Sequence, residues 1–128
     1  MSEENVKIVQ RMFEAYGRAG AAAATGDFDP DIVWNPAEEV PQHGPDETVA
    51  YMARWEREWE DLTTVPEEFI DAGDRVLVTV HFSGRGRGSG IEVDTRLYEV
   101  YSLREGKIVR MDEFTERSQA LEAAGLSE

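Results

Sequence analysis

The chain has 128 residues, of which 41% are hydrophobic and 31% are charged, and it contains no cysteine. This length and composition predict one globular domain over residues 1–128, and they exclude a disordered chain, disulfide bonds and thiol catalysis. The net charge of −14 opposes binding to nucleic acid or to an anionic membrane. No apolar run is long enough for a membrane helix, and the acidic start lacks the pattern of a signal peptide, so we expect a cytoplasmic protein.

The first half of the chain has the periodicity of helices. One apolar stripe at helical spacing consists of Val6, Val9, Phe13 and Tyr16. The stretch "GRAGAAAATGDFDPD" then predicts a short alanine-rich turn of helix, and a brief strand is expected at residues 32–35. A second helix is expected from Pro45 to Asp61, and its apolar side consists of Met52, Trp55, Trp59 and Leu62.

After this helix the hydrophobic period changes from 3.6 to about 2, which indicates strands. The expected strands cover residues 64–73, 74–84, 91–103 and 104–114, and a short helix is expected at 118–126. Helices followed by a run of antiparallel strands predict an α+β fold. The helices can bury their apolar stripes only by covering one face of the sheet.

The long strand at 91–103 contains the most specific feature of the sequence. Most of the residues at every second position along it are apolar, and Glu99 is the single charge on that row. A three-residue turn ending at Gly106 would pair Glu99 with Met111 on the next strand. Glu113 would then lie diagonally opposite Glu99, with roughly 7–8 Å between the β-carbons. The sequence therefore predicts two carboxylates on an otherwise apolar concave surface.

The chain resembles the SnoaL-like group of the nuclear transport factor two-like superfamily, which includes ketosteroid isomerase and limonene epoxide hydrolase. The resemblance covers nearly the whole chain and is most specific in "DPDIVW", "DAGDRVLVTV", "YSLREGKIVRMDEF" and "ALEAAGL". It implies a cone-shaped α+β barrel, with helices packed on the concave face of a curved, mainly antiparallel sheet. The superfamily includes isomerases, cyclases, hydrolases and binding proteins, so the resemblance implies a fold more strongly than an activity.

Each known site of this superfamily is matched only in part. The general base of ketosteroid isomerase precedes a proline at the end of the first strand, where this chain has Asn35. Its neutral aspartic acid corresponds to Glu99, and its tyrosine on the first helix corresponds to Met12 or Tyr16. The last-strand acid of limonene epoxide hydrolase and the acid/base of SnoaL-like polyketide cyclases fall at or beside Glu113. The Arg-x-Asp of the epoxide hydrolase is replaced by Val80 and Phe82.

These observations predict that the cone binds an apolar or amphipathic small molecule. Glu113 and Glu99 are the candidate catalytic residues, for cofactor-free isomerisation, cyclisation, hydration or epoxide opening. The candidate substrate-binding residues are Asn35, Tyr16, Trp34, Trp55, Trp59, Val80, Phe82, Leu97, Tyr101 and Met111. The alternative is a non-catalytic ligand-binding or dimerisation module, because no complete known site is present.

The sequence predicts neither a metal site nor a bound cofactor. His43 and His81 are not spaced as metal ligands, and no Ser-His-Asp arrangement can be assigned. "GRGRGSG" is followed by a strand and not by a helix, which excludes a dinucleotide-binding loop and favours the tip of a hairpin.

The convex face of the sheet predicts a homodimer. Its residues include Leu77, His81, Tyr98, Val100, Ile108 and Phe114. An apolar sheet face of this kind usually marks an interface, and superfamily members often pair through it. We also expect Arg96 and Arg110 to lie near Asp94 and Asp112 of the partner.

Overall fold

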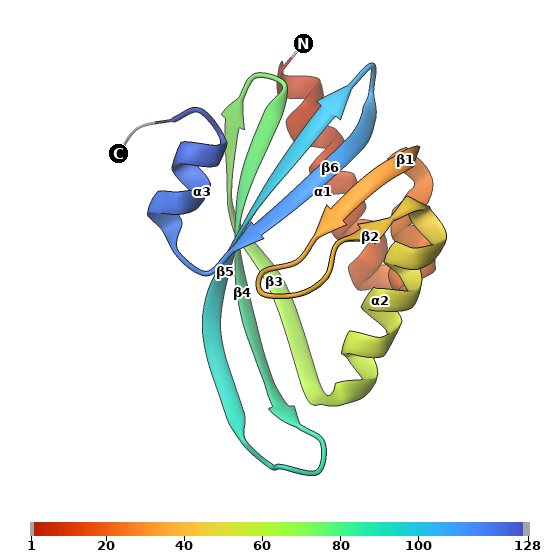
Figure 1. Cartoon of the computed structure of the whole chain (residues 1–128), viewed down its shortest axis with the longest axis vertical. Helices are drawn as coiled ribbons and strands as arrows, with labels where there is room; N and C mark the ends of the chain where they lie inside the picture. The colour runs from red at the N-terminus through yellow and green to blue at the C-terminus, as the bar shows by residue number, and fades with distance from the viewer. Residues whose placement is uncertain (1, 127–128) are drawn as a thin grey trace.

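The computed structural model describes residues 2–126, and the strands in this part of the chain form a mixed, open six-stranded sheet in the order β2-β1-β6-β5-β4-β3 (Figure 1). Along the chain the elements are α1 (Ser2–Ala19), the 3₁₀ helix η1 (Ala21–Asp27), β1 (Phe28–Asn35), β2 (Gln42–His43), α2 (Gly44–Glu58), β3 (Trp59–Ala72), β4 (Arg75–Gly86), β5 (Glu92–Arg104), β6 (Lys107–Phe114) and α3 (Arg117–Ala123). Neighbouring strands are antiparallel except β1 and β6, which are parallel. The α+β fold predicted from the sequence is confirmed.

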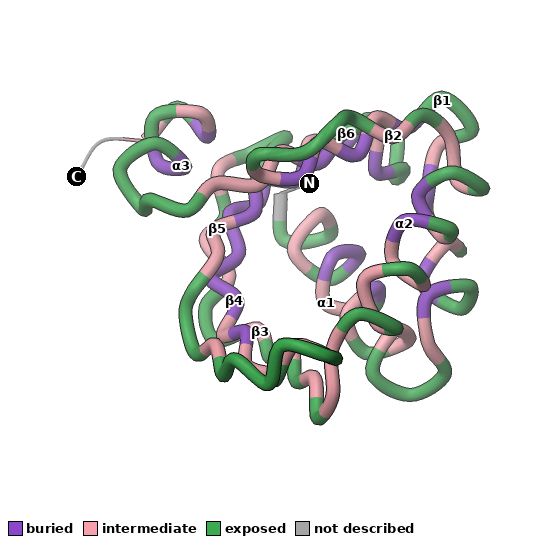
Figure 2. Tube along the Cα trace, turned by 60° about the horizontal axis from the view of Figure 1, so that its bottom comes forward, coloured by how far each residue is buried: buried purple, intermediate pink, exposed green. Residues whose placement is uncertain are grey.

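The sheet curves around α1, and α2 completes the enclosure (Figure 2). The main core lies between these helices and the inner face of the sheet, with Val9 of α1, Ile32 of β1 and Tyr101 of β5 fully buried in it. α3 packs on the opposite, outer face, where Leu121 contacts a second cluster around Leu77. Both faces of the central strands are therefore covered over part of their length. This explains why residues 76–80 of β4 are buried without alternation.

The turn between β5 and β6 differs from the predicted one. Glu105 and Gly106 both have positive φ angles, of 52° and 77°, and they form a two-residue turn that pairs Arg104 with Lys107. The register then shifts by one residue between Ser102 and Leu103. Beyond this irregularity each residue of β5 pairs two positions further along β6 than predicted. Because side chains alternate with a period of two, this difference leaves them on their predicted faces.

The irregularity in this hairpin changes the face on which Ile108 lies. Ile108 pairs with Leu103 and is fully buried in the inner core, although the sequence placed it on the outer face. Arg110, beyond the shift, pairs with Ser102. An extra residue in one strand exchanges the faces on either side of it, and this is why strict alternation failed here.

Several element boundaries also differ from the predicted ones. α2 ends at Glu58, and Trp59 begins β3 instead of continuing the helix. β1 begins at Phe28, four residues earlier than predicted, and β2 was not predicted. Trp59 has suitable spacing for the helical stripe, but it pairs with Gly86 and packs edge-on against Phe82, so tertiary contacts override the helical pattern.

Candidate functional site

A cavity lies between the inner face of the sheet and the helices α1 and α2. The space open to the centre of a water molecule is about 90 Å³. The lining is mainly aromatic and aliphatic and consists of Met12, Phe13, Tyr16, Ala24, Trp34, Tyr51, Met52, Trp55, Thr64, Val80, Phe82, Leu97, Glu99, Tyr101 and Glu113. Such a wall, with a few polar groups, is typical of a site for a small organic molecule.

Glu99 and Glu113 face this cavity from adjacent strands. They form a direct cross-strand pair between β5 and β6, and they were predicted as diagonal neighbours. Direct pairs have their β-carbons roughly 4.5–5.5 Å apart, which is closer than the predicted arrangement. Glu99 is only 7% exposed, whereas Glu113 is half-buried at the cavity wall. The structure therefore brings the two predicted catalytic carboxyl groups together.

Each carboxyl group of this pair has one hydrogen-bond donor. The hydroxyl of Tyr101 donates to Oε1 of Glu99 at 2.6 Å. The backbone N–H of Ala37, in the loop after β1, donates to Oε1 of Glu113 at 3.1 Å. No salt bridge between residues 2–126 involves Glu99 or Glu113. The pair is hydrogen-bonded, and no cationic side chain of the described residues forms an ion pair with it.

Burial and the neighbouring acid set the protonation of Glu99. Burial raises the pKa of Glu99 well above its ordinary value of 4.5, and the charge of Glu113 raises it further. The hydrogen bond from Tyr101 acts in the opposite direction and is the smaller effect. Burial, followed by the charge of Glu99, also raises the pKa of Tyr101. The site thus favours a neutral carboxylic acid beside a second carboxyl group.

Two further tyrosines at the cavity are held in their neutral form. Burial raises the pKa of Tyr16 above its ordinary value of 10.0, and the nearby Glu56 carboxylate adds to the shift. Burial also raises the pKa of Tyr51, whose hydroxyl donates to Oε2 of Glu39 at 2.8 Å. Tyr16 therefore stays a neutral phenol, with its hydroxyl beside the Glu56 carboxylate. In the described part of the chain, no cluster of histidine, aspartate or glutamate is arranged to hold a metal ion.

Three residues predicted to bind substrate lie outside the cavity lining. Asn35 points to the other face of β1, where its amide donates to Oδ1 of Asp112 at 3.0 Å. Ile32 and Trp34 are the buried, inward residues of this strand. The same alternation would have predicted that Asn35 faces away from the cavity. Met111 is 1% exposed and belongs to the packed core.

Trp59 is the third of these residues, and it lines a separate, adjacent pocket. The other seven predicted binding residues line the cavity, namely Tyr16, Trp34, Trp55, Val80, Phe82, Leu97 and Tyr101.

Sequence reasoning missed several residues of the lining. Tyr51 precedes Trp55 by one helical turn on α2, and the two rings stack with centroids 6.4 Å apart. This spacing was a usable signal, because residues at i and i+4 share a helix face. Thr64 of β3 gave no comparable signal. The donor to Glu113 is a backbone N–H, and no side-chain type in the sequence indicates such a donor.

The outer face of the sheet differs from the apolar surface predicted for dimerisation. Leu77 and Val100 are 0% and 1% exposed because α3 covers them, with Tyr98 and Phe114 packed at the edge of the same cluster. The short helix was predicted, but its position on this face was not.

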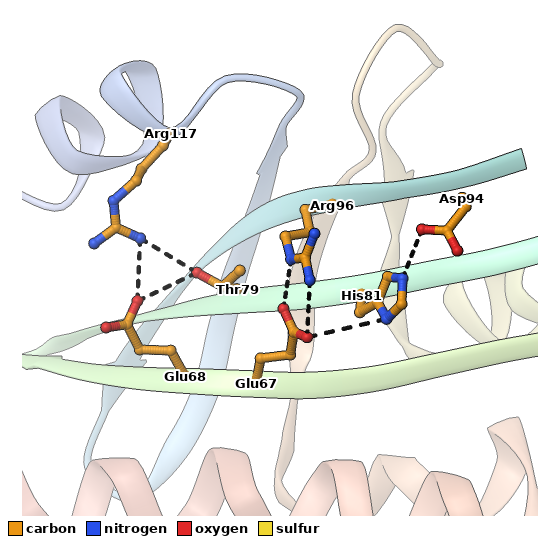
Figure 3. Close-up of polar contacts among 7 residues, drawn as sticks. All are labelled: Glu67, Glu68, Thr79, His81, Asp94, Arg96 and Arg117. Carbon is orange, nitrogen blue, oxygen red and sulfur yellow. Dashed lines mark hydrogen bonds and ion pairs between the residues drawn. The ribbon is translucent and has the colours of Figure 1, made fainter.

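The remaining outer surface of β3, β4 and β5 carries ion pairs within the chain (Figure 3). Arg96 binds Glu67 with nitrogen–oxygen distances of 2.6 and 3.2 Å, and His81 contacts Asp94 at 2.8 Å. Nearer α3, Arg117 contacts Glu68 at 3.1 Å (Figure 3). Arg96 was expected to pair with a partner chain, but its guanidinium already has an acidic neighbour in its own chain. The same holds for Arg110, which binds Asp112 at 2.8 Å.

The comparisons with known proteins agree with this fold. The family model for the SnoaL-like domain matches residues 9–111. An NTF2-like protein from Burkholderia thailandensis E264 has 29% sequence identity and a TM-score of 0.82, over 91% of this chain and 95% of that one. An NTF2-like protein from Burkholderia xenovorans LB400 has 25% identity and a TM-score of 0.79, over 97% of each chain.

A third solved structure, of a candidate SnoaL-like polyketide cyclase from Jannaschia sp. CCS1, has 23% identity and a TM-score of 0.78. It is matched over 95% of this chain and 91% of that one, and at this identity it supports the fold alone. The comparison with curated proteins finds no match. Within residues 2–126, no helix combines the length and the apolar character needed to cross a bilayer.

Proposed function

Because the chain belongs to the SnoaL-like domain family, we propose that its cavity binds an apolar or amphipathic small molecule and that Glu99 and Glu113 carry out acid/base chemistry on it. The observation that supports this proposal is the direct Glu99–Glu113 pair in an otherwise apolar wall. Two acids without a balancing cation are costly to maintain in such a place unless they have a use.

The cavity volume limits the size of the group that it can enclose. Its space of about 90 Å³ is smaller than the roughly 150 Å³ of an apolar cavity that binds benzene. The cavity therefore encloses at most about one ring of a bound molecule. Trp34 and Trp55 supply flat apolar surface for such a ring.

The two glutamates have different roles in this proposal. Glu113, oriented by the N–H of Ala37, is the general base that removes a proton from the substrate. Glu99, kept neutral by burial and oriented by Tyr101, is the acid that donates a hydrogen bond or a proton to the oxygen where charge develops. These roles suit isomerisation, polyketide-type cyclisation, hydration or epoxide opening without a cofactor.

A synthetic probe can test whether Glu113 acts as a base without knowledge of the natural substrate. In 5-nitrobenzisoxazole, a base removes the proton on the carbon next to nitrogen. The electrons of that bond form a nitrile, the nitrogen–oxygen bond breaks, and a coloured phenolate is released. We expect saturable phenolate release by the protein. Glu113→Gln should lower the rate about 100-fold or more, because general-base catalysis contributes roughly that much.

Matched controls separate a catalytic effect from a structural one. Glu92→Gln removes an exposed carboxylate from the same strand as Glu99, and it should leave the rate unchanged. Glu113→Asp should keep part of the activity, because the carboxylate is retained but moved back by one methylene. A rate in Glu113→Gln equal to that of the unmodified protein would refute the proposed base.

The second candidate is a ligand-binding module without catalysis. It is favoured by Asn35, which occupies the position of the general base of ketosteroid isomerase and whose side chain is turned away from the cavity to Asp112. This alternative predicts that 5-nitrobenzisoxazole binds in the cavity and quenches tryptophan fluorescence, but that no phenolate is released.

The homodimer stays a prediction for this chain, as does its location in the cytoplasm. The covering of Leu77 and Val100 by α3 removes part of the apolar surface on which the dimer prediction rested. A dimer through the outer face would have to use the polar surface shown in Figure 3. Light scattering decides the matter, since the chain has a mass of 14.4 kDa and a dimer has twice that mass.

A further inference from the structure

The wall of the main cavity is both aromatic and acidic. Seven of its fifteen lining residues are aromatic, namely Phe13, Tyr16, Trp34, Tyr51, Trp55, Phe82 and Tyr101. Its charged residues are Glu99 and Glu113, and no lysine, arginine or histidine of the described chain lines it. An anionic group in the cavity would therefore face two acids and no cation, which disfavours a carboxylate or a phosphate as the enclosed group.

The phenol hydroxyls of this wall already lie beside carboxyl groups. The three pairs are Tyr101–Glu99 at 2.6 Å, Tyr51–Glu39 at 2.8 Å and Tyr16–Glu56. A phenol has one proton to donate, so these hydroxyls have none left for an acceptor on a ligand. The other donors among the lining side chains belong to Trp34, Trp55 and Thr64, and they are neutral.

The two acids, in contrast, keep free acceptor atoms. The hydrogen bonds from Tyr101 and from the N–H of Ala37 both end on Oε1 of their glutamate. Within residues 2–126, no hydrogen bond ends on Oε2 of Glu99 or Glu113, and neither atom is among the buried atoms that lack a partner. Both Oε2 atoms are therefore accessible and can accept a hydrogen bond from a ligand.

The acid pair also leaves one negative charge in the wall. When Glu99 holds its proton, Glu113 carries this charge, and no cationic side chain of residues 2–126 forms an ion pair with either acid. Arg54 lies over the Tyr51 ring, 5.3 Å from its centroid, but it is exposed, contacts Glu58 and does not line the cavity. A cation from outside the chain would therefore balance a charge that the fold leaves unpaired.

We propose that the polar group of the molecule bound in the cavity is a protonated amine, carried on an apolar body of about one small ring. Its N–H groups would donate to Oε2 of Glu113 and Glu99, and the aromatic wall suits a cation because π systems attract positive charge. A neutral hydroxyl could donate as well, but it would leave the charge of the pair unbalanced. The net charge of −14 also favours the approach of a cation. The proposal rests on the proposed function only in requiring that the cavity binds a small molecule.

The test compares cyclopentylamine, which is protonated at neutral pH, with cyclopentanol, which has a similar shape and no charge. Binding is followed by NMR through the indole N–H signals of Trp34 and Trp55, which line the cavity. Both molecules donate hydrogen bonds, so the comparison isolates the charge. The amine should bind about 10-fold more tightly, which is the difference between a charge-assisted and a neutral hydrogen bond. Only the amine should lower the pKa of Glu99, because a nearby cation favours the ionised acid.

Variants of the acid pair show whether the preference comes from its charge. Glu113→Gln should weaken binding of the amine about 10-fold and leave the affinity for cyclopentanol unchanged, which shows that the cavity is intact. Because Glu99 can ionise in place of Glu113, the double variant Glu99→Gln, Glu113→Gln removes both acids and should bind the two molecules equally. Glu92→Gln changes the net charge of the chain by the same amount as Glu113→Gln but at an exposed position of β5, and it should keep the preference.

The outcomes separate this proposal from the proposed function. If cyclopentanol binds as tightly as the amine, or if the double variant keeps the preference, the cationic ligand is refuted while binding in the cavity stands. If neither molecule shifts the signals of Trp34 and Trp55, binding of a small ring in the cavity is refuted, and this proposal is refuted with it. The acid/base roles of Glu99 and Glu113 are tested separately, by phenolate release from 5-nitrobenzisoxazole. A preference that is lost in the double variant and kept in Glu92→Gln would establish the amine site.

Discussion

The two faces of the sheet differ in how their charged side chains are paired. On the outer face of β3, β4 and β5, Arg96 contacts Glu67, Arg117 contacts Glu68 and His81 contacts Asp94, all in partly solvated positions (Figure 3). On the inner face, Glu99 of β5 and Glu113 of β6 share an apolar wall, and no salt bridge within residues 2–126 involves either of them.

This difference shows where unusual chemistry can reside. Exposed ion pairs contribute little to stability and keep the ordinary charges of their groups. A carboxyl group in an apolar wall beside another acid has a raised pKa, and it can then donate and accept protons near neutral pH. The acidic residues of the inner face are thus the ones suited to catalysis, whereas those of the outer face are suited to solvation.

The largest expected effect comes from Tyr101, which links the inner core to the acid pair. Its ring is fully buried between Phe13 and Trp34, with centroids 6.0 and 5.9 Å away. Tyr101→Ala should lower the free energy of unfolding by about 3–5 kcal/mol, as measured in urea, because it leaves a cavity of aromatic size. Tyr101→Phe should be much milder, and it should raise the pKa of Glu99 further because it removes a hydrogen bond to the carboxylate.

A medium effect is expected in the dependence of stability on pH. The pKa of Glu99 is raised in the folded chain above its ordinary value of 4.5, so the folded state holds a proton that the unfolded state releases. Glu99 thus favours folding fully below about pH 4.5, and this contribution is lost as the pH rises through the folded pKa. Each tenfold difference between the acid dissociation constants of the folded and unfolded states is worth about 1.4 kcal/mol of stability.

Glu99→Gln should flatten this decline and make the variant more stable than the unmodified protein at alkaline pH. Thermal unfolding followed across the pH range checks this expectation. The exposed change Glu92→Gln should keep the original slope. A Glu99→Gln protein with an unchanged slope would show that Glu99 titrates normally.

The smallest effect is expected on the outer face. Glu67→Gln breaks the contact with Arg96 and removes one acidic neighbour of His81. It should leave the unfolding midpoint nearly unchanged, and any small loss should vanish at high salt, because exposed pairs are screened. A large, salt-independent loss would mean that the outer network is as structurally important as the inner core.

The inward-facing residues of the sheet were largely predictable from the sequence, because side chains alternate between the two faces along each strand. The row that contains Leu97, Glu99 and Tyr101 was predicted to face inward, and all three side chains line the cavity. The family resemblance also implied the α+β cone. These predictions depend on short-range periodicity, which a strand preserves over its whole length.

Features set by single backbone conformations were not predictable. The direct pairing of Glu99 with Glu113 depends on Glu105 adopting a positive φ, which a non-glycine residue rarely does, and on the register shift after Ser102. The position of α3 depends on the path of the chain after β6. The donation from the Ala37 N–H to Glu113 depends on loop geometry, so no side-chain pattern could indicate it.

The most direct test of the central claim is a carbon-detected NMR titration of the glutamate side chains in the unmodified protein and in Glu113→Gln. The account predicts that Glu99 titrates well above 4.5 in the unmodified protein, and that its midpoint falls in Glu113→Gln because a charge that raises its pKa has been removed. A Glu99 curve that is centred near 4.5 and unaffected by Glu113→Gln would contradict the claim that the two acids act as a pair.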